Sequence, residues 1–367
     1  MVYKDSSPQG SGIYNSARLL RTACLIGACC FALGVSACNN GQSEANKKAN
    51  GDTTATAAKT PSPAKDSVIK EPAGPLDTAL YNKLLVHLAN GDSSGRWPVH
   101  TAYPNAGAIL PFKRVLAYYG NLYSKKMGAL GEYPPDEMLR RLQAEGKNWA
   151  KADTTIPVQL ALHYIAVTAQ GSGGKDGKYR ARMPFKQIDS ILHIAARINA
   201  LVFLDIQVGF SNVQTEVPML EKYLKMPNVH LGIDAEFAMH PGQRVGKNVG
   251  TFDAADVNFT SNYLVNLVKA NNLPPKILIV HRWTRNMITN SKSIHTHPDV
   301  QIVMDMDGWG PPDLKYDTYR SWVGREPVQF TGFKLFYKND IRKPGSRLLT
   351  AKEVLSLKPS PIYIQYQ

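Results

Sequence analysis

The sequence predicts an α/β protein whose residues 76–367 form a single (β/α)8 TIM barrel. Eight short runs rich in β-branched and aromatic residues recur along this stretch, and such runs are typical of strands. Helical patterns with start signals lie between most of them, and this alternation indicates a parallel sheet. Eight such units in one domain-sized stretch favour a closed barrel over an open sheet.

The predicted strands share a high content of Val, Ile, Leu, Phe and Tyr. In chain order they are residues 114–120, 157–166, 200–209, 229–239, 276–283, 300–310, 328–338 and 361–367. An open doubly wound sheet is the alternative, and it would normally carry a glycine-rich phosphate turn after its first strand. Residues 120–123 (Gly-Asn-Leu-Tyr) follow the first strand instead, and they do not match that motif.

Apolar residues at intervals of three and four predict helices before and between these strands. The first such segment, at 76–88, precedes the barrel. Another begins at residues 134–137 (Pro-Pro-Asp-Glu), because proline and acidic residues favour a first helical turn. A third carries an apolar stripe over 185–198, and a fourth follows Asp253. Because the chain ends on its eighth strand, we expect the 76–88 helix to close the barrel beside that strand.

The N-terminus carries a secretory signal. Two arginines precede an apolar stretch at 23–35, and small residues lead to Cys38, which is the layout of a signal peptide and its cut site. The apolar stretch is too short to span a bilayer. The run 35–38 (Val-Ser-Ala-Cys) resembles the bacterial lipoprotein signal, which implies removal of residues 1–37 and acylation of Cys38. An ordinary signal peptide is the alternative.

Residues 38–75 are predicted to be a disordered tether. Their small and polar composition buries too little apolar surface to offset the entropy of ordering. A lipid on Cys38 would hold the domain at a membrane, since each buried CH₂ contributes about 0.8 kcal/mol. The sequence thus predicts a bacterial cell-envelope protein, on the periplasmic face or the outer membrane surface, and leaves open which membrane holds it.

Charge and cysteine content exclude several classes of protein. The net charge is +14, and loss of residues 1–37 would leave +12. The basic residues are spread along the chain without a Lys/Arg block between aromatics, so no nucleic-acid partner is predicted. An anionic envelope polymer or a merely solvated basic surface both fit this charge. All four cysteines lie within the first 38 residues, so an acylated Cys38 leaves none for disulfides, nucleophiles or zinc. The oligomeric state is not indicated.

Acidic residues end three of the predicted strands, where barrel active sites lie. Residues two apart on a strand share a face, which groups them into pairs. The pairs are Asp205 with Gln207, Asp234 with Glu236, and Asp305 with Asp307. Charges on otherwise apolar strands must be paired, hydrated or functional.

Further candidates for substrate binding lie at the same strand ends. They are Tyr119, His163, His281, Arg282, Trp283 and Trp309. Aromatic faces beside carboxylates suit the apolar faces and hydroxyl edges of sugar rings, so the two tryptophans are predicted sugar platforms. The seventh strand offers Lys334 and Tyr337, and the eighth offers Gln365 or Tyr366.

The Asp234-x-Glu236 pair fits one specific chemistry. Hydrolysis of a glycosidic bond needs an acid for the leaving oxygen and a second group for the oxocarbenium-like transition state. A protonated Glu beside an ionised Asp meets that need. The pair resembles the strand-four Asp-x-Glu of chitinase-like and lysozyme-like barrel glycosidases, which implies Glu236 as general acid and Asp234 as its partner. The sequence departs from the chitinase-like pattern at His230 and Gly232, where further aspartates would stand.

A second resemblance covers most of the domain. Residues 118–121, 127–135, 168–171 and 204–207 are similar to segments of exported bacterial barrel proteins of an uncharacterised family. This resemblance implies an envelope barrel and indicates no particular reaction.

The sequence therefore predicts a lipid-anchored envelope protein with a glycoside-hydrolase-like barrel that hydrolyses or binds a polysaccharide or another envelope glycan. No cofactor and no metal site are predicted. One alternative is a non-catalytic glycan-binding surface lipoprotein. Another is a metal-dependent phosphodiesterase-type barrel, in which His163, His281, Asp205, Glu236 and Asp307 would have to converge.

Overall fold

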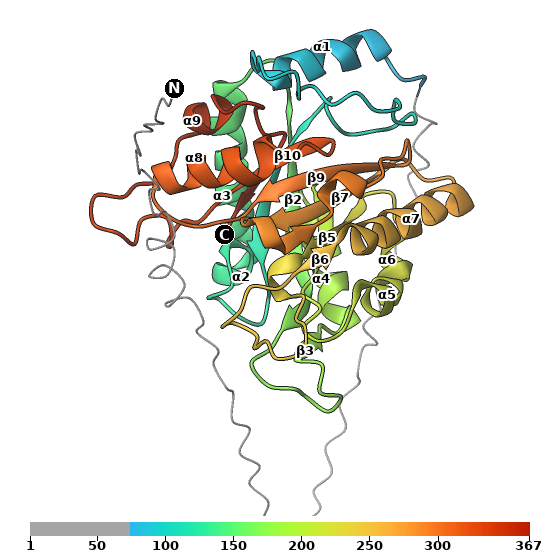
Figure 1. Ribbon diagram of the computed structural model, residues 1–367, viewed down its shortest axis with the longest axis vertical. Coiled ribbons are helices and arrows are strands. Elements are labelled where there is room, and N and C mark those ends of the chain that lie inside the picture. The colour runs from blue at the N-terminus through green and yellow to red at the C-terminus, as the bar shows by residue number, and fades with distance from the viewer. Residues whose placement is uncertain (1–73) are drawn as a thin grey trace, which may run out of the picture.

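The structure is a computed structural model, and it describes residues 74–367 (Figure 1). The predicted signal peptide, the lipidation site at Cys38 and nearly all of the predicted tether lie outside the described residues. Within the described part of the chain, no helix combines the length and the apolar character needed to cross a membrane.

Eight parallel strands close into a barrel, which confirms the predicted fold class and rules out the open sheet. They are β1 (Arg114–Gly120), β2 (Val158–Ala169), β4 (Leu201–Ile206), β5 (Val229–Asp234), β7 (Lys276–Arg282), β9 (Val300–Met306), β10 (Phe330–Leu335) and β11 (Tyr363–Tyr366). The barrel closes between β11 and β1, where Tyr363 pairs with Val115. A short strand, β3 (Arg180–Arg182), pairs antiparallel with the carboxyl end of β2.

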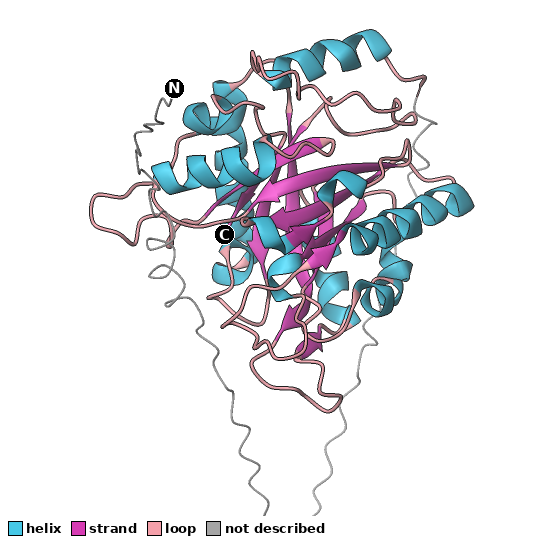
Figure 2. Ribbon diagram, viewed as in Figure 1, coloured by secondary structure: helices cyan, strands magenta, loops and turns pink. Residues whose placement is uncertain are grey.

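Helices surround the strands, as Figure 2 shows. They are α1 (Thr78–Ala89), α2 (Ala129–Glu132), α3 (Pro135–Ala152), α4 (Phe185–Ala196), α5 (Val213–Glu216), α6 (Glu221–Leu224), α7 (Ala254–Asn271), α8 (Pro312–Tyr319) and α9 (Ala351–Leu355). Two of the predicted helix start signals lie where the helices begin. Asp136 and Glu137 occupy the first turn of α3, and Asp253 and Asp256 form a reciprocal capping box at the start of α7. A two-stranded sheet of β6 (Phe252–Asp253) and β8 (Ile288–Thr289) lies outside the barrel.

Helix α1 closes the barrel at its floor. Leu84 and Leu88 pack with Val115 and Phe203 in an apolar cluster drawn from several strands, and the Leu88 carbonyl accepts a hydrogen bond from Ser360 N at 2.7 Å. In Figure 1, α1 lies at the opposite end of the barrel from β3. The sequence placed this helix beside the last strand. The helix does contact the residues that lead into β11 and shares an apolar cluster with Ile362 and Tyr363, whereas helix α3 lies against the outer face of β11.

The outer contact at β11 comes from Trp149 of α3, whose Nε1 donates to Tyr366 Oη at 3.0 Å. Helix α3 also contacts α9. The leucines of α1 cover the amino end of the barrel interior. The acidic side chains of the interior gather toward the other end.

Candidate functional site

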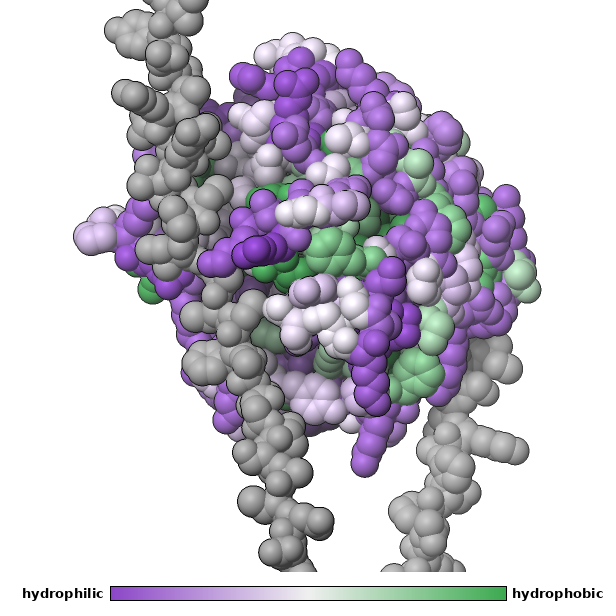
Figure 3. Space-filling view, turned by 60° about the horizontal axis from the view of Figure 1, so that its bottom comes forward, coloured by the Kyte–Doolittle hydropathy of each residue, from purple (hydrophilic) through white to green (hydrophobic). Residues whose placement is uncertain are grey.

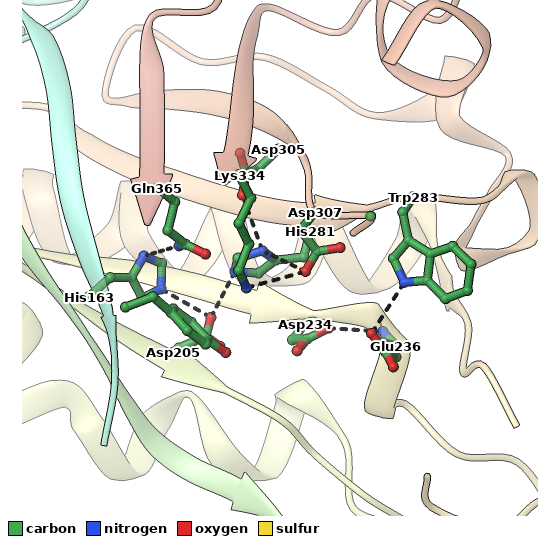
Figure 4. A network of polar contacts seen from close by, with 12 residues as sticks. His163, Asp205, Asp234, Glu236, His281, Trp283, Asp305, Asp307, Lys334 and Gln365 are labelled. Atoms are coloured by element: carbon green, nitrogen blue, oxygen red, sulfur yellow. Dashed lines mark hydrogen bonds and ion pairs between the residues drawn. The ribbon is translucent and has the colours of Figure 1, made fainter. Parts of the chain in front are cut away.

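Each strand of the barrel contributes one polar side chain to a single buried cluster in the interior. In chain order these residues are Tyr119, His163, Asp205, Asp234, His281, Asp305, Lys334 and Gln365, and we call them the polar ring. Figure 4 labels all of them except Tyr119. None of the eight is more than 3% exposed. Gln207 and Asp307, two residues beyond Asp205 and Asp305, add polar groups above the ring, and both are 6% exposed.

His163 is held at both ring nitrogens. Its Nδ1 lies 2.6 Å from Tyr363 Oη, and its Nε2 lies 3.2 Å from Asp205 Oδ1. Gln365 Nε2 donates to the same tyrosine oxygen at 2.8 Å. Burial lowers the pKa of His163 to about 4, so this imidazole is neutral at physiological pH.

His281 lies among three carboxylates. Its Nε2 is 3.3 Å from Asp205 Oδ1, and its Nδ1 is 3.3 Å from both Asp305 Oδ2 and Asp307 Oδ2. Burial acts to lower the pKa of His281, but the carboxylates, led by Asp205, raise it well above its usual value. Burial acts to raise the pKa of Asp205, but His281 and His163 together hold it below its usual value.

Two glycines make room for these acids inside the barrel. A Cβ atom at Gly232 would lie 2.4 Å from Asp205 Oδ1, and one at Gly332 would lie 2.5 Å from Asp305 Oδ1. The missing side chains on β5 and β10 are thus the space that the neighbouring aspartates occupy. A side chain at position 232 would therefore collide with Asp205.

Tyr119 and Gln207 link Asp205 to Asp234. Tyr119 Oη donates to Asp205 Oδ2 at 2.8 Å, and Gln207 Nε2 donates to Asp234 Oδ2 at 3.1 Å. The ammonium of Lys334 lies 3.8 Å above the Tyr119 ring and 3.7 Å from Asp307 Oδ2. The ring is therefore one connected network.

Glu236 and Trp283 form the exposed edge of this network, and we call them the rim pair. Both are half-buried, and Trp283 Nε1 donates to Glu236 Oε2 at 3.2 Å. Burial, followed by the charge of Asp307, raises the pKa of Glu236 to about 7. This carboxyl therefore carries a proton over part of the neutral range while it remains accessible to solvent.

Asp234 shapes the turn that carries Glu236. The last residue of β5, it accepts a hydrogen bond from Glu236 N at Oδ1 (3.0 Å), across the 3₁₀ turn Ala235–Phe237. The sequence analysis treated Asp234 as the ionised partner, yet burial raises its pKa well above normal. For Asp307, burial acts to raise the pKa, but His281 and Lys334 lower it overall. Asp307 is thus the ionised carboxylate near Glu236.

The structure separates two predicted residues from the polar ring. Arg282 points to the opposite face of β7 from His281, where its guanidinium contacts Glu326 Oε2 at 2.7 Å. Trp309 is half-buried, with the Arg342 guanidinium 5.8 Å from its ring centroid. Within residues 74–367, neither side chain forms a hydrogen bond or ion pair with the ring. Of the two tryptophans predicted as sugar platforms, Trp283 is the one that contacts Glu236.

Sequence reasoning missed the role of Tyr363 and did not assign roles to Asp305, Lys334 and Gln365. The two-residue alternation was the available signal, because Tyr363 and Gln365 share the inward face of β11. Of the adjacent tyrosines on β1, Tyr119 faces inward, while Tyr118 Oη contacts Tyr337 Oη at 3.0 Å.

The end of the barrel that carries β3 is turned toward the viewer in Figure 3. Hydrophobic side chains lie between hydrophilic ones on this face. The polar ring lies beneath the surface, because its members are almost fully buried. The rim pair is more exposed than any member of the ring.

No protein-family model and no curated protein sequence matches the chain. Among solved structures, the cellulase Cel5C_n is 12% identical, with 70% of this chain and 76% of that chain covered and a TM-score of 0.40. A hyperthermophilic endo-β-1,4-glucanase in complex with substrate is 9% identical, with 70% and 89% covered and a TM-score of 0.37. A xyloglucan-specific endo-β-1,4-glucanase from a metagenomic library, in complex with cellotriose, is 12% identical, with 64% and 78% covered and a TM-score of 0.33. Identity this low assigns no activity to the chain.

Proposed function

We propose that this protein is a lipid-anchored envelope enzyme that cleaves glycosidic bonds in a polysaccharide, with Glu236 as its general acid. One observation carries the proposal. Glu236 is a half-buried carboxyl at the active end of the barrel, bound by an indole N–H, with its pKa raised to about 7. A carboxyl that remains protonated near neutral pH can donate a proton to the leaving oxygen of a glycosidic bond.

The groups around Glu236 fit roles in the same reaction. Asp307 is the second carboxyl that we assign, because it lies at the top of the ring and its charge contributes to the raised pKa of Glu236. Trp283 offers an aromatic face to a sugar ring and orients the acid. Asp234 fixes the backbone of the acid through its 3.0 Å hydrogen bond to Glu236 N. His163, Asp205, Gln207 and Tyr119 form the floor of the site.

The anchor belongs to the same proposal. Acylation of Cys38 and a tether up to residue 75 would hold the barrel at the bacterial envelope, close to a polysaccharide substrate. The net charge of +12 that remains after loss of residues 1–37 supports attraction to an anionic polymer.

The substitution Glu236→Gln tests the catalytic role. Purified protein is incubated with a panel of envelope and plant polysaccharides, and new reducing ends and ligand binding are both measured. We expect the substitution to lower turnover by at least about 100-fold while binding is retained, because general acid catalysis contributes roughly 10²–10⁴-fold. Glu137→Gln, on the outer surface of α3, is the matched control and should behave as the wild type.

The glycan-binding alternative gives a different result in this experiment. A protein that binds a polysaccharide but releases no reducing ends, with or without Glu236, would be a binding lipoprotein. A second candidate function, metal-dependent phosphodiester hydrolysis, is favoured by the convergence of His163, Asp205 and His281, whose ligand atoms lie within 4.8 Å of one another. It predicts activity on a phosphodiester that a chelator removes.

A further inference from the structure

We propose that His163, Asp205 and His281 bind one divalent transition-metal ion inside the polar ring. These residues come from β2, β4 and β7, and all three are fully buried. This inference goes beyond the proposed cleavage of glycans and does not depend on it. The sequence analysis predicts no metal site, and only its phosphodiesterase-type alternative required these three residues to converge.

The three donor atoms have the chemistry and spacing of a metal site. Asp205 Oδ1 lies 3.2 Å from His163 Nε2 and 3.3 Å from His281 Nε2. Two imidazole nitrogens and one carboxylate oxygen are a donor set typical of Zn²⁺ and of neighbouring first-row metals. Two donors that each lie about 2.0–2.1 Å from a tetrahedral ion are about 3.3 Å apart. Both separations from Asp205 Oδ1 agree with that value, and all three donor atoms lie within 4.8 Å of one another.

The remaining atoms of these side chains are engaged as in metal sites. Ligating histidines usually present their other nitrogen to a fixed partner, which sets the tautomer. The Nδ1 of His163 lies 2.6 Å from Tyr363 Oη, and the Nδ1 of His281 lies 3.3 Å from Asp305 Oδ2. Tyr119 donates to Asp205 Oδ2, the oxygen that faces away from the histidines. Each ligand is therefore oriented with one donor atom directed at the others (Figure 4).

An independent observation also indicates a cation here. Although His281 is fully buried, neither of its nitrogens makes a hydrogen bond of good geometry, and both carboxylate oxygens of Asp305 also lack one. Buried polar atoms without partners are costly, and each one in a folded protein requires an explanation. A metal ion on His281 Nε2 would satisfy that atom and fix the Nδ1 proton toward Asp305.

The barrel also leaves room between two of the ligands. A Cβ atom at Gly232 would lie 2.4 Å from Asp205 Oδ1 and 2.6 Å from His163 Nε2. Position 232 is the inward-facing residue of β5 at this level of the barrel. The absence of a side chain there keeps both donor atoms accessible from β5.

The rival explanation is that His281 carries two protons and bridges the carboxylates without a metal. The two explanations differ in a direct binding measurement. The full chain is purified without an affinity tag, stripped with a chelator and titrated with Zn²⁺ and with Co²⁺. Bound metal per chain is counted by elemental analysis, and the visible spectrum of the Co²⁺ form reports its ligands.

We expect one Zn²⁺ per chain and a Co²⁺ spectrum typical of low coordination number with nitrogen and oxygen ligands. His281→Gln and Asp205→Asn should each weaken binding by at least about 100-fold, and Tyr363→Phe by about 10-fold, because outer partners contribute about 10–100-fold in affinity. His193→Gln, on the exposed side of α4, is the control and should bind as the wild type. Circular dichroism shows whether each variant is folded.

Three results would overturn the inference. One is a wild-type chain that binds no metal, with the His281 ring shown by nitrogen chemical shifts to be doubly protonated. Another is metal that both ligand variants retain. The third is several weakly held ions per chain, which would indicate adventitious binding only. The nitrogen shifts are measured on the wild type, so the metal site can be tested even if the variants fail to fold. Metal binding is measured without substrate, so a negative result here does not bear on the catalytic role of Glu236.

Discussion

Trp283 donates its indole N–H to Glu236 Oε2 across 3.2 Å, and this bond joins the residue after β7 to the turn after β5. Two neighbouring strands of the barrel thus hold one acid and one aromatic ring in a fixed arrangement. The pair lies at the exposed edge of a network that is otherwise sealed from solvent. Its chemistry can therefore be tested without disturbing the buried ring.

The pKa of Glu236, about 7, sets the direction of the pH dependence. A general acid works only in its protonated form, so activity should be retained below about pH 7 and lost as the pH rises through it. A pH–rate profile measures this loss.

The raised pKa of Glu236 also makes the stability of the fold depend on pH. A carboxyl whose pKa is higher in the folded than in the unfolded protein stabilises the fold at low pH, and this contribution is lost as the pH rises from about 4.5 to about 7. Thermal unfolding of the wild type and of Glu236→Gln should therefore converge at low pH and differ in slope across this interval. Equal slopes would contradict the shift.

Replacement of Trp283 by phenylalanine should move this pH dependence. The indole hydrogen bond lowers the pKa of Glu236, because it favours the ionised form. Loss of that bond should raise the pKa further and shift the alkaline limb of the activity profile to higher pH, while an aromatic face remains. A pH–rate profile measures the shift, and Trp309→Phe serves as the control. An alkaline limb that stays in place or moves to lower pH would show that the bond does not act on the acid.

Much of the site could be predicted because strand alternation is a strict rule. Asp205, Asp234, His281 and Asp307 sit at strand ends and share a face with their neighbours two residues away. The same rule places Arg282 opposite His281, so its exclusion from the ring was also available from the sequence. The sequence was therefore sufficient to predict which side chains of one strand share a face.

The remainder depends on distances between strands, which no local pattern encodes. His163, Asp205 and His281 are separated by some forty residues or more in the sequence, yet their donor atoms lie within 4.8 Å of one another. The protonation of Asp234 and the ionisation of Asp307 depend on burial and on the positions of His281 and Lys334. For α1, the helical pattern shows that one face is apolar but not which surface it covers.

The lipid anchor is tested at Cys38. If the predicted signal is a lipoprotein signal, cells that express the full chain should incorporate labelled palmitate into it, and the product should partition into detergent. Cys38→Ser should abolish both, because acylation requires that thiol. Cys30→Ser, within the predicted signal peptide, is the control and should retain the label. Export without any label in the wild type would indicate an ordinary signal peptide.

Gly232 should tolerate no side chain. A Cβ atom there would lie 2.4 Å from Asp205 Oδ1, and both groups are enclosed by the barrel. Gly232→Ala should lower the free energy of unfolding by about 1–3 kcal/mol, the usual cost of overpacking a dense interior. Gly74→Ala is the control, because nothing lies within 4 Å of its added Cβ. Urea unfolding followed by tryptophan fluorescence measures both, and an unchanged midpoint for Gly232→Ala would show that Asp205 can move aside.

The role of α1 as the floor of the barrel can be tested on the helix itself. Leu84 is 4% exposed and packs with inward-facing residues of several strands, whereas Leu80, one turn earlier, is 41% exposed. Leu84→Ala should therefore reduce the free energy of unfolding by about 2–5 kcal/mol, the range for a leucine removed from a core. Leu80→Ala should change it by less than about 0.5 kcal/mol, as expected for a surface site. If both substitutions prove equally mild in urea unfolding, the helix contributes little to the core, and the amino end of the barrel is stable without it.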